Sequence, residues 1–320
     1  MPQFELHPIT AAGLLVTDWC PARCRHCYVS SGPDGTAWMT VEVAAAHLAA
    51  LVRLGVAAEG IHIGGGEPFG DFERLLEIVR AARAVGYVET NGFWATETDV
   101  VRRHLRTLAE AGMMQLSISA DPYHQEFVPP ERVRLLYDVA REVLGHDGVR
   151  ARRWKWLQNA RDVAAMPEAA RLELFRTFLG RYPERLSGRA AELLAPLLPR
   201  SPPEEIPLEG CRKALLESRH VHVDAAGWVY PGTCAGISLG RATADRPLDL
   251  LLTEWRVADS PIIAMLADGG PRALATFAAR HGFQPDAAGY AGKCHLCWAA
   301  RKALVRAGAA GETLRPETLY

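Results

Sequence analysis

Residues 20–27 read CPARCRHC, which sets Cys20, Cys24 and Cys27 at C-x3-C-x2-C spacing. A loop this short can turn three sulfurs toward one centre, and clustered thiolates favour an iron–sulfur cluster or another soft metal over a disulfide. Three ligands leave one iron of a four-iron cluster without a protein ligand, free to bind something else. The alternatives are a zinc site or three unrelated buried cysteines, although zinc sites more often pair a C-x2-C motif with a distant second pair.

The remaining cysteines support the same chemistry. The chain has 320 residues and seven cysteines, and those outside the first motif are Cys211, Cys234, Cys294 and Cys297. Four is the number that closes a second cluster completely, and zinc remains the other candidate. The odd count and the clustered spacing argue against disulfides. Reduced cysteines predict a reducing compartment, the cytoplasm.

Composition excludes several classes of partner. The formal net charge of −1 predicts no general attraction to nucleic acid or to a membrane. No apolar run is long enough to span a bilayer, and residues 1–6 lack the pattern of a secretory signal. With 49% hydrophobic residues, the chain can bury one large core or two modest ones.

The first half of the chain alternates between strand-like and helix-like segments. This alternation predicts parallel strands with helices outside, hence an α/β fold of the partial (β/α) barrel type with five or six parallel strands. A site would then lie at the carboxyl-terminal rim. The expected strands are 13–17, 61–63, 87–92, 113–119 and 149–156, and the expected helices are 40–55, 71–85, 97–111 and 130–144.

The second half has a different pattern. Residues 158–200 hold no strand-like run and predict two or three helices, followed by a proline-rich segment up to residue 207. A β-hairpin is expected over 219–231, and a helical tail after Cys297. We therefore divide the chain into a barrel core (1–156), a helical linker (157–207) and a small carboxyl-terminal domain with a hairpin and a helix (208–320).

Polar and glycine-rich motifs follow three of the expected strands. Three glycines let the backbone come close to a ligand, and the absence of a following Lys-Ser/Thr argues against a phosphate loop. Ordinary turn chemistry is the alternative for the Asn-Gly and Asp-Pro pairs. The motifs are Gly64-Gly65-Gly66-Glu67-Pro68, Thr90-Asn91-Gly92 and Ser119-Ala120-Asp121, and the last is followed by Pro122, Tyr123 and His124.

In this order, the cysteine and glycine motifs resemble the radical S-adenosylmethionine (radical SAM) superfamily. His26 stands where that family usually has an aromatic residue or His, and Tyr28 follows the third cysteine. The resemblance implies a 4Fe–4S cluster on the three cysteines, with S-adenosylmethionine chelated at the open iron. One electron then splits the sulfonium into methionine and a 5′-deoxyadenosyl radical, which takes a hydrogen atom from the substrate.

The family's GGE-P, T-N-G and S-x-D motifs also imply cofactor contacts. In the family, the glycine-rich edge hydrogen-bonds the amino group of the cofactor's methionine, and the glutamate, here Glu67, helps to fix it. The cofactor-binding set expected on this basis is Tyr28, Gly64, Gly65, Gly66, Glu67, Asn91, Ser119 and Asp121.

Other polar residues are candidates for substrate contact. Tyr123 and His124 would lie just past the rim, where they could contact substrate or shuttle a proton, a capped surface His being the alternative. His62 alternates with two isoleucines and is expected to face the barrel interior, where it needs a partner. Arg150 and Arg152 share one strand face, either as anion ligands or as a solvated basic patch.

The second cysteine set resembles the twitch and SPASM auxiliary domains of the superfamily. A full SPASM domain needs more cysteines than remain, so the resemblance implies a single, fully ligated 4Fe–4S cluster on Cys211, Cys234, Cys294 and Cys297. Full ligation argues for electron transfer rather than direct substrate binding.

Three functions follow. The first is an oxidoreductase that acts on a small molecule in natural-product or cofactor biosynthesis, passes an electron to the second cluster, and is reduced by a flavodoxin- or ferredoxin-type donor. The second is a maturase that crosslinks or oxidises a ribosomally made peptide; because the strand at Leu14 begins so early, we expect a separate leader-binding partner in that case. The third is a non-catalytic scaffold with zinc at Cys294 and Cys297.

Overall fold

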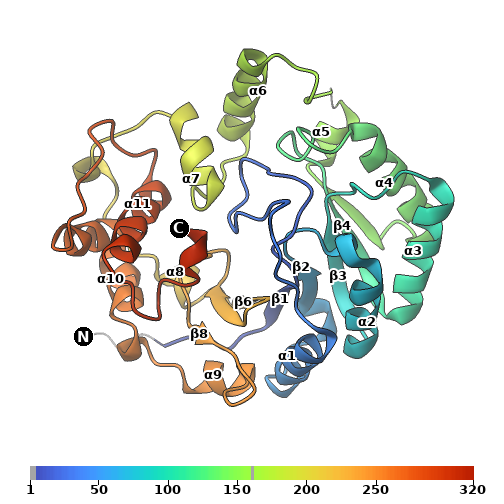
Figure 1. Cartoon of the computed structure of the whole chain (residues 1–320), viewed down its shortest axis with the longest axis horizontal. Helices are drawn as coiled ribbons and strands as arrows, with labels where there is room; N and C mark the ends of the chain where they lie inside the picture. Colours follow the sequence, from blue (N-terminus) through green and yellow to red (C-terminus); the bar gives the residue numbers. More distant parts are fainter. Residues whose placement is uncertain (1–4, 160–161) are drawn as a thin grey trace.

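The computed structural model describes residues 5–159 and 162–320, and its strands form one sheet in the order β5-β4-β3-β2-β1-β6-β7-β8 (Figure 1). The first six strands along the chain run parallel, and β7 and β8 are antiparallel additions. The strands are β1 Ala11–Leu15, β2 Ile61–Gly64, β3 Val85–Thr90, β4 Met113–Ser119, β5 Val149–Arg152, β6 His220–Asp224, β7 Trp228–Pro231 and β8 Gly240–Arg241.

Helices cover the outside of this sheet, so the expected α/β partial barrel is confirmed. Figure 1 shows α1 to α4 along one flank and α10 with α11 on the opposite side. None of the helices in the described ranges is long and apolar enough to cross a membrane. The helices are α1 Val41–Arg53, α2 Phe72–Ala82, α3 Thr98–Ala111, α4 Pro130–Leu144, α5 Trp154–Gln158, α6 Glu168–Arg181, α7 Arg189–Leu193, α8 Arg212–Leu215, α9 Leu248–Glu254, α10 Pro261–Ala279 and α11 Lys293–Arg306.

Local signals explain most helix boundaries, with one clear exception. Thr40, the first residue of the helix expected over 40–55, caps α1 by accepting a hydrogen bond from the amide of Val43 at 3.3 Å. In contrast, α2 ends at Ala82, because Arg83 turns the chain at φ 62°. Gly86, the residue after the helix expected over 71–85, lies inside β3, where a Cβ would stand 2.4 Å from the carbonyl oxygen of Glu59. This glycine serves a close backbone approach rather than a helix end.

The hairpin predicted over 219–231 is confirmed, and its first strand has an unexpected partner. β6 pairs in parallel with β1, so the hairpin continues the core sheet at the β1 edge. At the other edge, the strand expected over 149–156 stops at Arg152. Arg153 adopts φ 66°, and the short helix α5 follows. The described parallel strands therefore number six, with the sixth beside β1 rather than beyond β5.

Two apolar clusters stabilise the molecule. The larger fills the space between the sheet and its helices. The smaller lies beside the cysteine loop and joins Cys20 and Cys24 to aromatic side chains of α6 and to Tyr123. The helical segment after residue 162 therefore packs against the loop that carries the first cysteine motif.

Candidate active site and second cysteine cluster

The first cysteine motif lies in the loop that leaves the carboxyl-terminal end of β1. Cys20 and Cys24 are buried and Cys27 is half-buried, and all three line one cavity of about 380 Å³. Burial raises the pKa of the Cys20 thiol to about 12 and that of Cys24 well above its usual value. Without a cation, these sulfurs therefore keep their protons, and a bound metal would displace them.

Helix α7, which comes more than 150 residues later in the chain, holds this loop through its first residue, Arg189. The Arg189 side chain donates hydrogen bonds to the carbonyl oxygens of Cys24 (3.1 Å), Ser30 (3.0 Å) and Ser31. The backbone amide of Arg189 donates to the carbonyl oxygen of Cys27 (3.1 Å). Gly188 has φ 57°, and a Cβ there would stand 2.7 Å from the Cys27 carbonyl oxygen. Sequence reasoning gave no role to this segment, because no local pattern links residue 189 to residues 24–31.

The glycine-rich motif packs its backbone against the residues that lead into the cysteine loop. The amide of Gly66 donates to the carbonyl of Thr17, and that of Glu67 to the carbonyl of Trp19, both at 2.7 Å. A Cβ on Gly66 would stand 2.0 Å from the Trp19 carbonyl oxygen. Gly64, Gly65 and Gly66 also line the cavity, so the motif supports the loop and leaves its own backbone accessible.

Glu67 does not line the cavity, and its carboxylate is fully buried beneath the rim. It accepts hydrogen bonds from the amide of Asn91 (2.7 Å), the hydroxyl of Thr90 (3.0 Å) and the amide of Phe69 (3.2 Å). Burial raises its pKa to about 7, although these three donors favour the ionised form. Glu67 therefore ties the end of β2 to the end of β3.

Asn91 and Ser119 line the cavity, as the strand-end motifs predicted. The Asn91 side-chain amide donates to the sulfur of Cys20 at 3.5 Å, which links the T-N-G turn directly to the cysteine loop. Its side-chain oxygen accepts from the amide of Phe93 at 2.9 Å and so fixes the orientation of the amide group. Tyr28 also lines the cavity, and its ring centroid lies 6.2 Å from that of His222.

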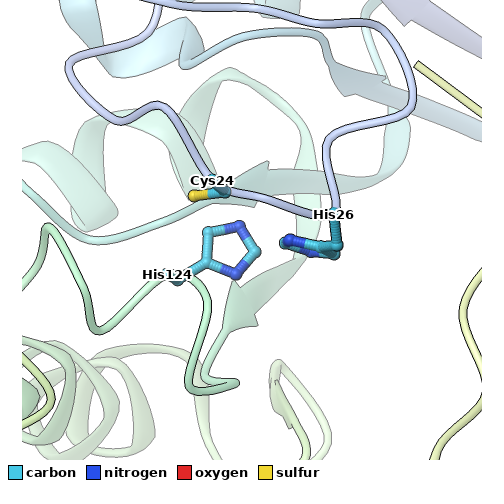
Figure 2. Close-up of side chains that lie close together, drawn as sticks. All are labelled: Cys24, His26 and His124. Atoms are coloured by element: carbon cyan, nitrogen blue, oxygen red, sulfur yellow. The ribbon is translucent and has the colours of Figure 1, made fainter. Parts of the chain in front are cut away.

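Asp121 is buried and organises two histidines near Cys24. Its carboxylate contacts Nδ1 of His124 at 2.8 Å and Nε2 of His26 at 3.7 Å. Burial alone would raise its pKa, but the two imidazoles hold that pKa below its usual range. Burial also lowers the pKa of His26 to about 4. Figure 2 shows both rings beside the Cys24 sulfur, and one ligand atom of each residue lies within 4.8 Å of the other two.

His124 lines the cavity, but Tyr123 does not. Tyr123 is completely buried, its ring stacked on that of His26 with centroids 4.8 Å apart and packed against Phe175 at 5.0 Å. Its hydroxyl is buried without a hydrogen-bond partner among the described residues. The structure thus brings His124 to the cavity and places Tyr123 in the apolar cluster behind it.

The deeper part of the cavity is lined by polar strand residues. His62 faces this interior, which confirms the prediction from its alternation, and its ring stacks on that of Tyr87 at 4.7 Å. Arg152 is largely solvated, yet its guanidinium lies 3.7 Å from the carboxylate of Glu89. Sequence reasoning missed His220 and His222, which line the same cavity, because their pairing with β1 cannot be read from local pattern.

The four remaining cysteines line a second cavity of about 950 Å³. Cys211 precedes α8, Cys234 follows β7, and Cys294 and Cys297 lie one turn apart at the start of α11. Burial raises the pKa of Cys211 to about 11 and that of Cys297 to about 12. No three of these sulfurs lie within 4.8 Å of one another among the described residues.

Two cationic side chains accompany this set. The guanidinium of Arg185 donates to the sulfur of Cys234 at 2.6 Å. Arg301, one turn after Cys297 on α11, is buried and donates to the carbonyl of Ala235 and the hydroxyl of Tyr320, both at 2.9 Å. Positive charge next to buried thiols favours their thiolate form.

The two cavities share a wall. Glu184 and Arg185 line both, while Thr233 lines the first and its neighbour Cys234 lines the second. Two short segments, 183–187 and 233–234, therefore connect the two cysteine sets.

Comparison with known proteins gives one family and several relatives. The radical SAM superfamily matches residues 14–164. A curated relative, "Putative peptide biosynthesis protein YydG" of Bacillus subtilis (strain 168), is 27% identical over 126 residues, which cover 38% of this chain and 39% of that protein. The match therefore spans about two fifths of the relative's length.

Three solved structures are also similar. BtrN in complex with AdoMet and 2-DOIA has a TM-score of 0.38 at 13% identity, and the match covers 82% of this chain and 89% of the BtrN chain. Streptococcus suis SuiB bound to precursor peptide SuiA has a TM-score of 0.38 at 13% identity, covering 80% and 66%. Native anSMEcpe with bound AdoMet has a TM-score of 0.45 at 13% identity, covering 93% and 96%.

Proposed function

Through its residues 14–164 the chain is a member of the radical SAM superfamily, and on this premise we propose that it cleaves S-adenosylmethionine reductively in the 380 Å³ cavity. Membership makes the chain an enzyme and supports S-adenosylmethionine and a 4Fe–4S cluster as cofactors. The observation that carries the proposal is the convergence of Cys20, Cys24 and Cys27 with the glycine-rich edge on one cavity. No fourth cysteine lines that cavity in the described part of the chain.

The donor set fits the cofactors. Three cysteines match a cluster with one open iron, to which the sulfonium compound would bind and be split into methionine and a 5′-deoxyadenosyl radical. Gly64, Gly65 and Gly66 let the cofactor's methionine approach the backbone of the strand edge. Asn91 and Ser119 offer hydrogen bonds from the same rim.

Other residues act by holding this arrangement. The Glu67 carboxylate accepts hydrogen bonds from Thr90 and Asn91 at the end of β3 and from Phe69 in its own turn. We therefore assign to Glu67 the positioning of the ends of β2 and β3 rather than direct contact with the cofactor. Asp121 orients His124, which faces the cavity and is our candidate for proton exchange with the substrate. Tyr123 acts through its stacking on His26, as a packing partner of the cysteine loop.

We propose that Cys211, Cys234, Cys294 and Cys297 bind a second, fully ligated 4Fe–4S cluster. The four sulfurs surround one cavity large enough for such a group. Tetrahedral zinc with Zn–S bonds of about 2.3 Å needs sulfurs about 3.8 Å apart, closer than any three of them lie. A cluster binds each cysteine at a separate iron and therefore does not require such closely spaced sulfurs. The shared wall at Arg185 and Cys234 favours an electron-transfer role.

The proposed division of the chain follows from these two sites. We assign the first cysteine set to a barrel core within 1–156, the helical linker to 157–207, and the twitch-like part with the second set to 208–320, which also supplies the sixth parallel strand of the core sheet, β6. The linker then has a definite task, because Arg189 clamps the first cysteine loop and Arg185 contacts the second set.

For the substrate we propose a peptide, modified by a radical oxidation or rearrangement. The supporting observation is the partial match to a putative peptide biosynthesis protein over 126 residues. A small metabolite, the first expectation from the sequence, has no comparable observation in its favour. We further propose a flavodoxin- or ferredoxin-type electron donor and a cytoplasmic location.

The test uses anaerobically reconstituted enzyme with dithionite and S-adenosylmethionine. We expect about eight irons per chain and formation of 5′-deoxyadenosine. Cys24→Ala should abolish cleavage while keeping about half of the iron. Retained cleavage in that variant would contradict the assignment. In deuterated buffer, a short peptide encoded beside the gene should acquire deuterium or lose mass only when both enzyme and cofactor are present, and an unmodified peptide would refute the peptide substrate alone.

A further inference from the structure

Three histidines meet in the first cavity, on the two strands that flank β1. His62 comes from β2, and His220 and His222 come from β6. One ring nitrogen of each lies within 4.8 Å of the other two, and all three residues line the cavity. The proposed radical chemistry gives this cluster no role.

A glycine in the strand between them lets the rings come together. Gly13 on β1 is in register with His62 on one side and with His222 on the other. A Cβ at Gly13 would stand 2.3 Å from Nε2 of His62 and 2.5 Å from Cδ2 of His222. Glycine inside a strand costs stability and marks a close approach, here that of two imidazoles across β1.

Two of the histidines, His220 and His222, have a ring nitrogen available to bind a ligand. Nδ1 of His222 lies 2.6 Å from the carbonyl oxygen of Gly232, so it carries the proton and leaves Nε2 with a free lone pair. This outer hydrogen bond to a backbone carbonyl is the arrangement usual for metal-binding histidines. Nε2 of His220 is buried and has no hydrogen-bond partner among the described residues. A buried polar atom without a partner needs an explanation.

The third ring is held rigidly. His62 stacks on Tyr87 with an interplanar angle of 3°, and the guanidinium of Arg150 lies over the Tyr87 ring at 4.3 Å. His62 is 3% exposed, so its ring is enclosed by these neighbours. Its orientation is therefore fixed by packing, and its nitrogens remain available.

We propose that His62, His220 and His222 bind one divalent transition-metal ion, with zinc the best match, and leave its fourth position open to the cavity. Three imidazoles with an open position are a known zinc arrangement, and imidazole suits borderline metals, whereas the thiolate sets suit iron–sulfur clusters. The metal site is independent of the radical chemistry. Only its use rests on the proposed function: the open position would hold a donor atom of the substrate.

The experiment measures zinc in the holoenzyme with both clusters assembled. The protein is washed with chelator, incubated with ZnCl₂, desalted, and analysed for metals and by zinc-edge X-ray absorption. We expect about one zinc per chain in a nitrogen/oxygen shell at about 2.0–2.1 Å. His62→Gln and His222→Gln should each weaken zinc binding by about 100-fold or more, since the loss of an outer partner alone costs about 10- to 100-fold.

A matched control uses another buried imidazole. His47 on α1 is 6% exposed, and its Nε2 also lacks a hydrogen-bond partner among the described residues, but it lies outside the cluster. His47→Gln should keep both zinc and iron. A sulfur shell at about 2.3 Å in the wild type, equal zinc in the His62 and His222 variants, or no bound zinc would each overturn the proposal and make this a packing cluster. The ligand shell of zinc in the wild type tests the metal site even if a variant misfolds. Deoxyadenosine formation tests the proposed function separately.

Discussion

Replacing Arg189 with Met should loosen the first cysteine loop without unfolding the protein. The guanidinium donates hydrogen bonds to three loop carbonyls, those of Cys24, Ser30 and Ser31. The side chain is half-buried, and Met can replace the packing of its aliphatic part. At about 1 kcal/mol net for each hydrogen bond, the loop loses about 3 kcal/mol of ordering free energy. That is about a hundredfold increase in the population of the open loop.

The assay follows release of iron to a chromophoric chelator under anaerobic conditions. Half of the iron, that of the first cluster, should be released up to about a hundredfold faster in Arg189→Met, while the other half keeps its wild-type rate. Arg189→Lys should give an intermediate rate, because an ammonium lacks the planar fork of donors.

The control is Arg176→Met. Arg176 lies on the neighbouring helix α6, where it contacts the Leu197 carbonyl and Glu173; among the described residues it makes no hydrogen bond or ion pair with the cysteine loop. This variant should release iron like the wild type. Unchanged iron release in Arg189→Met, or equal acceleration of both halves, would refute the reasoning, because the clamp touches only the first loop.

Further predictions concern the second cysteine set and the strand ends. Cys234→Ala should lower iron to about half while S-adenosylmethionine cleavage with dithionite survives; loss of cleavage by a folded variant would contradict a separate electron-transfer role. Gly66→Ala should destabilise the fold and abolish cofactor binding, because its Cβ would stand 2.0 Å from a backbone oxygen, and calorimetry with and without cofactor checks this. Glu67→Gln leaves a donor of the Asn91–Thr90–Phe69 set without its acceptor and should cost about 1–3 kcal/mol of unfolding free energy. Burial raises the pKa of Glu67 from 4.5 to about 7, so ionising this carboxyl group costs folding free energy as the pH rises through that range. The stability advantage of the wild type over Glu67→Gln should therefore shrink by up to about 3 kcal/mol between pH 4.5 and a pH above 7. Melting curves measured across this range check the prediction, and an advantage that grew with pH would contradict it.

Much of the barrel could be predicted from the sequence, because its elements carry local signals. The strand at Met113–Ser119 and the helices 98–111 and 130–144 lie where hydrophobic periodicity indicated them. The cysteine spacing and the glycine motif then identified the rim of the sheet that forms the cavity, and Asn91 and Ser119 lie on it as expected. Local pattern was sufficient because each motif directly follows its own strand.

The remaining features depend on contacts between distant segments. Neither the parallel pairing of β6 with β1 nor the meeting of His62 with His222 across Gly13 leaves a local signature. Arg189 contacts a loop more than 150 residues away. Arg153, whose left-handed backbone ends β5, is a residue type that rarely adopts that conformation, so the predicted strand ran too far.

The most direct test of the central claim is the formation of 5′-deoxyadenosine by the anaerobically reconstituted wild type with dithionite and S-adenosylmethionine. Deoxyadenosine and methionine are expected in equal amounts from the wild type, and neither product from Cys24→Ala. An intact 4Fe–4S spectrum on Cys20, Cys24 and Cys27 without any deoxyadenosine would contradict it.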